Sequence, residues 1–67
     1  MSRSSNTQDS VRTVRAEYHE MPGLGLTIQQ AARLFALSAH ESERVFAQLI
    51  DEGVVFRDAT GVYRKYS

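Results

Sequence analysis

The sequence of 67 residues contains no cysteine, only one proline and only four glycines. The absence of cysteine excludes disulfides, thiolate metal sites and cysteine nucleophiles, and it favours a reducing compartment. Such low proline and glycine contents, together with 42% hydrophobic residues, argue against extended disorder. We therefore expect one small folded domain with a modest core, because a chain of this length buries only about 60% of its surface on folding.

Long apolar runs are also missing, and their absence bears on where the protein is expected to reside. The longest run is far shorter than the roughly 20 residues that a membrane helix requires. The first residues after Met1 are polar and contain no apolar stretch that could serve as a signal peptide. The sequence therefore predicts a cytoplasmic protein with no membrane contact.

Net charge is the third absence, since eight Lys and Arg residues balance eight Asp and Glu residues. A nucleic-acid-binding domain is usually basic, because phosphate neutralisation supplies most of its non-specific affinity. The charge is nevertheless uneven. Residues 1–16 and 54–67 each have three basic residues and one acidic residue, whereas residues 38–53 have one basic and four acidic residues. Two basic ends thus flank an acidic middle.

The beginning of the chain combines a polar segment with a helical pattern. Residues 1–9 have no hydrophobic residue after Met1, which predicts a disordered polar tail. Hydrophobic residues then recur with a helical period and predict a first helix over residues 10–21, ended by Pro22. The apolar stripe of this helix consists of Val11, Val14, Tyr18 and Met21.

Two capping boxes predict the second and third helices. In the first box the Thr27 hydroxyl can accept from the Gln30 amide while the Gln30 side chain returns to Thr27. In the second box Ser38 and Glu41 can do the same at the start of a helix that ends at Gly53. Because Ser38 must leave the helical conformation to cap, we expect a break of only three or four residues between the two helices.

Residues 54–57 and 62–66 are rich in β-formers and flank a loop that ends in Gly61, which predicts a β-hairpin. Helices this short are not stable alone, so their apolar faces must cover one another and the hairpin. The predicted core comprises Val14, Tyr18, Ile28, Ala32, Phe35, Val45, Leu49, Val54 and Tyr63, and Ser42, Phe46 and Ile50 are also expected to face inward.

This order of elements resembles that of the winged helix-turn-helix family. Residues 26–38 (LTIQQAARLFALS) resemble the first helix of the motif and its turn. Residues 43–57 (ERVFAQLIDEGVVFR) resemble the recognition helix and the first wing strand, and residues 58–64 (DATGVYR) resemble the wing tip and the return strand. The chain is also similar to short, uncharacterised bacterial proteins. The resemblance implies an α+β fold over residues 10–67, with three helices and a C-terminal two-stranded β-hairpin wing.

The resemblance further implies a bacterial DNA-binding protein that acts as a transcriptional regulator or nucleoid accessory factor. Its third helix would enter the major groove of double-stranded DNA, and the basic wing would contact the backbone. In this arrangement Arg44 would pair with guanine and Gln48 with adenine. Carried over position by position, the implied DNA contacts are Thr27, Gln29, His40, Glu43, Arg44, Gln48, Arg57, Arg64 and Lys65.

A single domain of this size contacts few base pairs, so a homodimer on a palindromic site is expected. We hypothesise that its surface is formed by the first helix together with Leu24 and Leu26. In the alternative, both leucines belong to the core.

Two carboxylates depart from the pattern of a reading helix, namely Glu41 and Glu43. A carboxylate in the major groove is favourable only opposite the amino group of cytosine. We expect Glu41 to turn inward as the partner of Ser38. The acidic third helix leaves a second interpretation open, a winged helix that docks on a protein partner without binding DNA. The wing cations would then only protect an exposed edge strand from aggregation.

No catalytic or metal site is predicted. His19 and His40 are each followed by glutamate, but both lack the second histidine four residues on that a zinc-binding helix requires. No serine lies in a nucleophile elbow, and the segment from Gly23 to Gly25 is too short for a phosphate-binding loop. We therefore expect neither an enzyme nor a bound cofactor.

Overall fold

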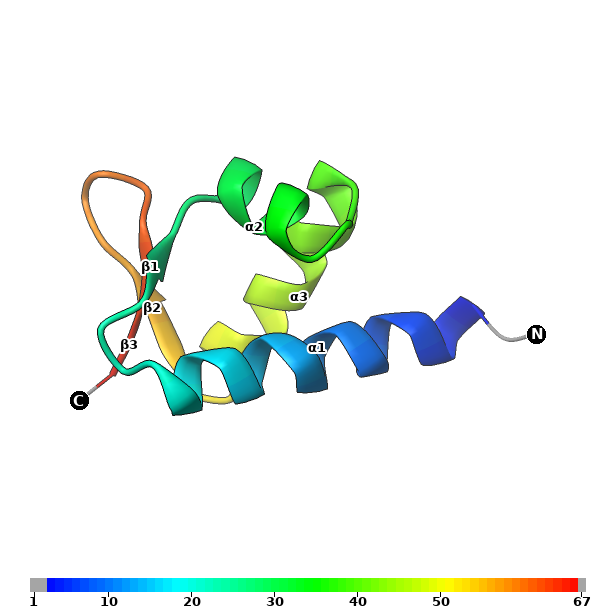
Figure 1. Ribbon diagram of the computed structural model, residues 1–67, viewed down its shortest axis with the longest axis horizontal. Coiled ribbons are helices and arrows are strands. Elements are labelled where there is room, and N and C mark those ends of the chain that lie inside the picture. Colours follow the sequence, from blue (N-terminus) through cyan, green and yellow to red (C-terminus); the bar gives the residue numbers. More distant parts are fainter. Residues whose placement is uncertain (1–2, 67) are drawn as a thin grey trace.

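The computed structural model describes the backbone of residues 3–66 and the side chains of residues 7–66. Within this part of the chain the α+β architecture with three helices is confirmed (Figure 1). In chain order the elements are α1 (Arg3–Glu20), β1 (Gly25–Leu26), α2 (Ile28–Leu34), α3 (Ala39–Asp51), β2 (Val55–Arg57) and β3 (Tyr63–Lys65). None of these helices combines the length and the apolar character needed to cross a bilayer.

Helix α1 begins at Arg3, seven residues before the predicted start. The helix thus covers residues 3–9, for which the sequence predicts a disordered tail, and residues 1–2 lie outside the described residues. Polar contacts hold this extension, because Thr7 Oγ1 donates to Glu41 Oε2 at 3.0 Å and Gln8 Nε2 donates to Gln48 Oε1 at 3.5 Å. An existing helix also extends at low cost, since each added residue gains one hydrogen bond.

The sheet has three antiparallel strands in the order β1-β3-β2, so the predicted two-stranded hairpin lacked one strand. In β1, Leu26 pairs with Tyr63 of β3, and Tyr63 also pairs with Arg57 of β2. A strand of two residues is too short to show a period of two in the sequence. A Cβ at Gly25 would lie 2.9 Å from Val62 Cγ1, so the close approach of β1 requires glycine.

The core lies where α1, α3 and the sheet meet, and most of its members were predicted. On α2 Ala31 is buried and Ala32 only partly, and Val55 rather than the predicted Val54 is buried on β2. Ile50 is 43% exposed, so its predicted inward position is wrong. Leu26 is buried and Leu24 packs against the core, which contradicts their assignment to a dimer surface. The fully buried hydrophobic residues are Val11, Val14, Tyr18, Leu26, Ala31, Val45, Phe46, Leu49 and Val55.

The corner between α2 and α3 is confirmed, and the four residues that separate Leu34 from Ala39 agree with the predicted break. Ala36 adopts a left-handed backbone with φ of 57°. The Leu37 N–H donates to the Ala32 carbonyl at 2.8 Å and the Ala36 N–H to the Arg33 carbonyl at 3.4 Å, which is the Schellman pattern. Ser38 then takes an extended conformation, so α3 starts in a new direction.

Of the two predicted capping boxes, the first is complete and the second is half formed. Thr27 Oγ1 accepts from the Gln30 N–H at 3.1 Å, and Gln30 Oε1 accepts from the Thr27 N–H at 3.0 Å. Ser38 Oγ accepts from the Glu41 N–H at 2.9 Å. The Glu41 carboxylate does not return to Ser38, because it accepts from Thr7 of α1 instead.

Candidate nucleic-acid interface

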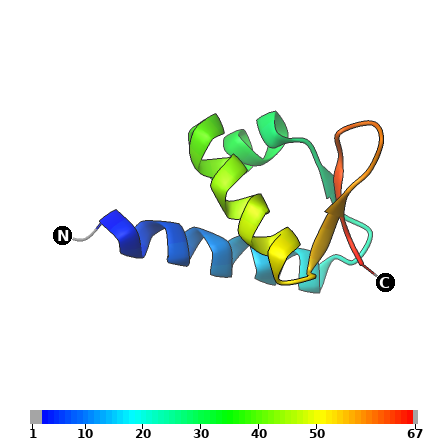
Figure 2. The same ribbon diagram turned by 180° about the vertical axis from the view of Figure 1, so that it is seen from behind.

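A groove of about 740 Å³ lies between the start of α2, the outer side of α3 and the β2–β3 loop. We call it the α3–loop groove. Figures 1 and 2 show the β2–β3 loop rising beside α2 on the side of the molecule away from α1. The residues that line the groove with polar side chains are Thr27, Gln29, Glu43, Arg57, Thr60 and Tyr63.

Helix α3 has a clear division between a packed side and a free side. Ser42, Val45, Phe46 and Leu49 face the core and are buried. His40, Glu43 and Arg44 lie three and four positions apart, so they share the opposite side, and all three are exposed. Glu43 is the member of this set that lines the α3–loop groove.

The β2–β3 loop is organised by one carboxylate, Asp58. Its Oδ1 accepts from Thr60 Oγ1 at 2.6 Å, from the Thr60 N–H at 2.9 Å and from the Val62 N–H at 3.0 Å. Its Oδ2 accepts from Arg64 Nε at 2.9 Å. These donors, led by the Thr60 hydroxyl and then Arg64, hold the pKa of Asp58 well below its usual value. The loop therefore has a defined shape beside the groove.

One unpaired cation lines the groove and two more lie on the helices that border it, although the net charge of the protein is zero. Among residues 7–66, ion pairs join Arg15 to Glu52 at 2.8 Å and Arg64 to Asp58 at 2.9 Å. In the same range of residues Arg33, Arg44 and Arg57 make no ion pair within 4.0 Å, and all three are exposed.

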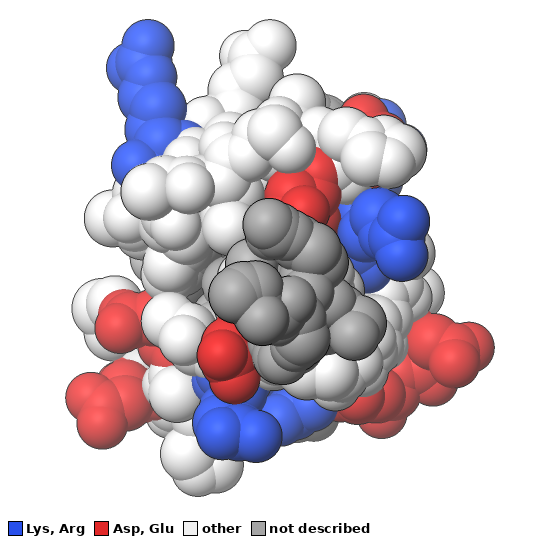
Figure 3. All heavy atoms as spheres, turned by 90° about the vertical axis from the view of Figure 1, so that its right-hand side faces the viewer, with Lys and Arg blue, Asp and Glu red and all other residues white. Residues whose placement is uncertain are grey.

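Figure 3 shows a different face, the end of the molecule where α1 begins, and acidic and basic groups are interspersed on it.

Six of the nine DNA-contact residues implied by the resemblance lie on this side of the molecule. Four line the α3–loop groove itself, and two lie on the neighbouring free side of α3. Arg33 was not among the implied contacts, although it shares a hollow with Thr27, Gln29 and Gln30. Its position as a charged residue near the end of a predicted helix could have suggested Arg33 as a candidate contact. The six residues are Thr27, Gln29, Glu43, Arg57, His40 and Arg44.

The structure does not bring Gln48, Arg64 and Lys65 to the groove. Gln48 faces α1, because its Nε2 donates to Glu52 Oε2 at 3.1 Å and its Oε1 accepts from Gln8. Arg64 is paired with the loop carboxylate. Lys65 lines a separate hollow of about 230 Å³ that also includes side chains of α1.

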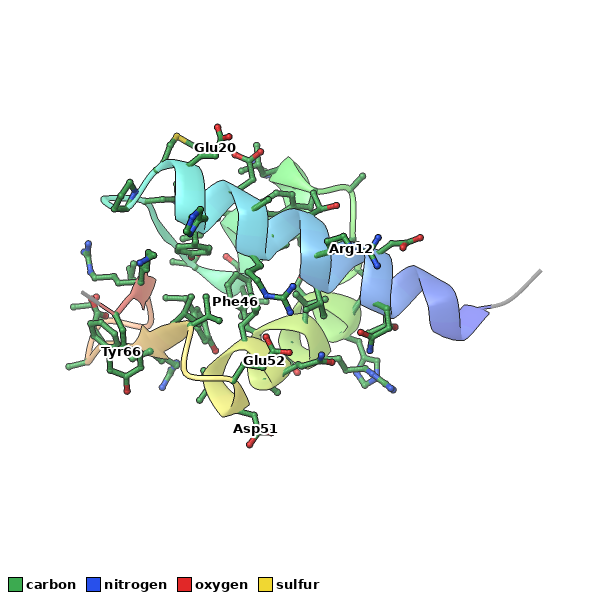
Figure 4. All side chains as sticks on the ribbon, turned by 90° about the horizontal axis from the view of Figure 1, so that it is seen from below. Arg12, Glu20, Phe46, Asp51, Glu52 and Tyr66 are labelled. Atoms are coloured by element: carbon green, nitrogen blue, oxygen red, sulfur yellow. The ribbon has the colours of Figure 1, made fainter. Side chains whose placement is uncertain are left out.

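The hollow beside Lys65 lies on the α1 side of the molecule. Arg15 and His19 of α1 line it together with Lys65 and Tyr66. Donation from Gln48 and from Arg15 lowers the pKa of the Glu52 carboxyl, which lies beside α1 (Figure 4). This side therefore combines the Arg15–Glu52 ion pair with Lys65, which makes no ion pair among the described residues.

The lining of the α3–loop groove can form hydrogen bonds and offers one charge of each sign. Hydroxyls of Thr27 and Thr60 and the amide of Gln29 can donate or accept, Arg57 only donates, and an ionised Glu43 only accepts. Among the described residues, no three His, Asp or Glu side chains lie close enough to hold a metal ion.

Comparison with known proteins adds no relative. No family model matches the chain, and no curated protein or solved structure matches it either.

Proposed function

We propose that the protein is a small winged-helix DNA-binding protein that acts as a transcriptional regulator or nucleoid accessory factor. The observation that carries this proposal is the α3–loop groove, in which the start of α2, the free side of α3 and the β2–β3 loop converge. Helix α3 would enter the major groove of double-stranded DNA, and the loop would act as the wing against the backbone.

The dimensions of α3 support this docking. An α-helix with its side chains is about 10–12 Å wide, and the major groove of B-DNA is about 12 Å wide. The break at Ser38 frees the start of α3 from α2, and His40 and Arg44 lie on its exposed side. These side chains can reach base edges without disturbing the core.

The unpaired arginines of α2 and β2 support contact with the DNA backbone. Arg33 lies at the end of α2 and Arg57 lies at the base of the β2–β3 loop. Arginine binds phosphate through several parallel donors and keeps its charge at any physiological pH. Together with Arg44 they supply three phosphate or base contacts.

A fluorescence anisotropy titration with generic duplex DNA tests the proposal. Two phosphates neutralised by Arg33 and Arg57 predict that affinity falls roughly 12-fold between about 50 and 200 mM salt. Arg57→Ala should weaken all duplexes alike and reduce the salt slope by about one, whereas Arg44→Ala should relax base preference. Arg12→Ala on the outer side of α1 removes the same charge away from the groove and serves as the control, with little change expected.

A second candidate function is a protein-interaction winged helix without DNA affinity. It is favoured by the zero net charge and by an aromatic pair on the sheet, Phe56 and Tyr66, whose ring centroids are 5.1 Å apart. Tyr66 is 52% exposed, and aromatic residues are enriched at protein interfaces. Absence of DNA binding at about 50 mM salt would overturn the first proposal and leave this one.

A further inference from the structure

The inference concerns Glu43, the acidic side chain in the α3–loop groove, and it rests on the proposed DNA-binding function. Three other carboxylates near α3 and the loop have partners, and Asp51 at the end of α3 lies outside the groove lining. Glu41 accepts from Thr7, Glu52 pairs with Arg15 and Asp58 pairs with Arg64. Among the described residues the Glu43 carboxylate has neither a hydrogen-bond donor nor an ion pair, although it is exposed and lines the groove.

The chemistry of an unpaired carboxylate in this position is restrictive. An ionised carboxylate can only accept hydrogen bonds, and it repels phosphate. In the major groove cytosine presents the N4 amino group as a donor. Adenine also presents a donor, but its N7 acceptor lies beside it, and guanine presents two acceptors. Cytosine is therefore the base edge that suits Glu43 best.

We propose that Glu43 makes the groove selective for duplexes that place a cytosine opposite it, with the carboxylate accepting from the N4 amino group. Arg57 and Thr60 on the far side of the groove contact the backbone, so the wing holds the register in which Glu43 meets a base. The cost of burying an unpaired carboxylate opposite any other base edge supplies the discrimination.

Selection from a duplex library with a randomised central segment tests this inference, with binding measured at about 50 mM salt. The wild-type protein should enrich cytosine at one position, with about tenfold discrimination against the other bases. Glu43→Gln should lose this preference and shift it toward adenine, since glutamine matches the donor and acceptor of that base. The same variant should bind generic DNA more tightly, because a negative charge is removed from the interface.

Asp51→Asn is the matched control, because it also removes one carboxylate from α3. Asp51 is exposed, lies two helical turns beyond Glu43 and points away from the body of the molecule (Figure 4). This variant should keep the cytosine preference. If Glu43→Gln selects the same bases as the wild type, the inference is overturned while the DNA-binding function stands. If the wild type binds no duplex at all, both are overturned.

Discussion

At the scale of single residues, Tyr18 shows how a polar atom is accommodated in a small core. Its side chain is fully buried, and its hydroxyl donates to the Tyr63 carbonyl at 2.6 Å. The ring also meets Phe46 edge to face, with centroids 6.1 Å apart. Burial raises the pKa of Tyr18 to about 12. One side chain thus joins α1 to α3 and to β3, and its ionisation is opposed by the fold.

Replacement of this hydroxyl should have an effect that depends on pH. At pH 7, Tyr18→Phe removes the hydrogen bond to the Tyr63 carbonyl and should lower the free energy of unfolding by about 0.5–1.5 kcal/mol. Between pH 10 and 12 the unfolded wild type ionises while the folded state resists, so the wild type loses stability as the pH rises. The phenylalanine variant lacks this loss, so the difference in free energy of unfolding between the two proteins should narrow as the pH rises. Urea unfolding at pH 7, 10 and 11.5 measures it, and a constant difference would contradict the assigned pKa.

At the scale of elements, α2 and α3 end in the same way with different residues. Both have the Schellman hydrogen-bond pattern, but the left-handed residue is Ala36 in α2 and Gly53 in α3, with φ of 57° and 78°. A side chain in this conformation costs roughly 1–2 kcal/mol. The end of α2, which forms the corner before α3, therefore carries backbone strain that the end of α3 does not.

A reciprocal pair of substitutions tests this strain. Ala36→Gly relieves it and should stabilise the protein by about 0.5–1 kcal/mol, because part of the gain is lost to the greater freedom of unfolded glycine. Gly53→Ala introduces it, and nothing lies within 4 Å of the added Cβ, so a loss of about 1 kcal/mol should come from the backbone alone. Thermal unfolding should shift by roughly 4–8 °C per kcal/mol, in opposite directions. Shifts of the same sign would mean that packing, not backbone conformation, dominates at one of the two sites.

Elements that depend on neighbouring residues were predictable, and those that depend on distant ones were not. The capping box at Thr27 and the break at Ser38 need only side chains within three residues, so the sequence indicates both. The first turns of α1 are held by Glu41 and Gln48, which lie more than thirty residues away. No local pattern around Thr7 predicts those partners. The hydrogen bond from Thr7 also takes the Glu41 carboxylate away from its predicted capping role.

At the scale of the whole molecule, the candidate site was predictable in part because it is built on both sides of the break at Ser38 between α2 and α3. Thr27 and Glu43 reach one groove because the two helices that carry them meet at Ser38. The face that each side chain takes is decided by packing. Adjacent strand residues point to opposite faces, so Arg64 and Lys65 cannot both serve one surface, and neither lines the groove.

The integrity of this arrangement depends on a core of very few side chains, and Leu49 is its most direct test. It is fully buried on α3, whereas its neighbour Ile50 is 43% exposed. Leu49→Ala should reduce the free energy of unfolding by about 2–5 kcal/mol, which is comparable with the whole stability of a small domain, so much of the protein should be unfolded at room temperature. Ile50→Ala removes a side chain of equal size and should cost far less, since that side chain is already largely in water. Circular dichroism melts of both variants make the comparison, and equal losses would mean that α3 is rotated from the orientation on which the α3–loop groove depends.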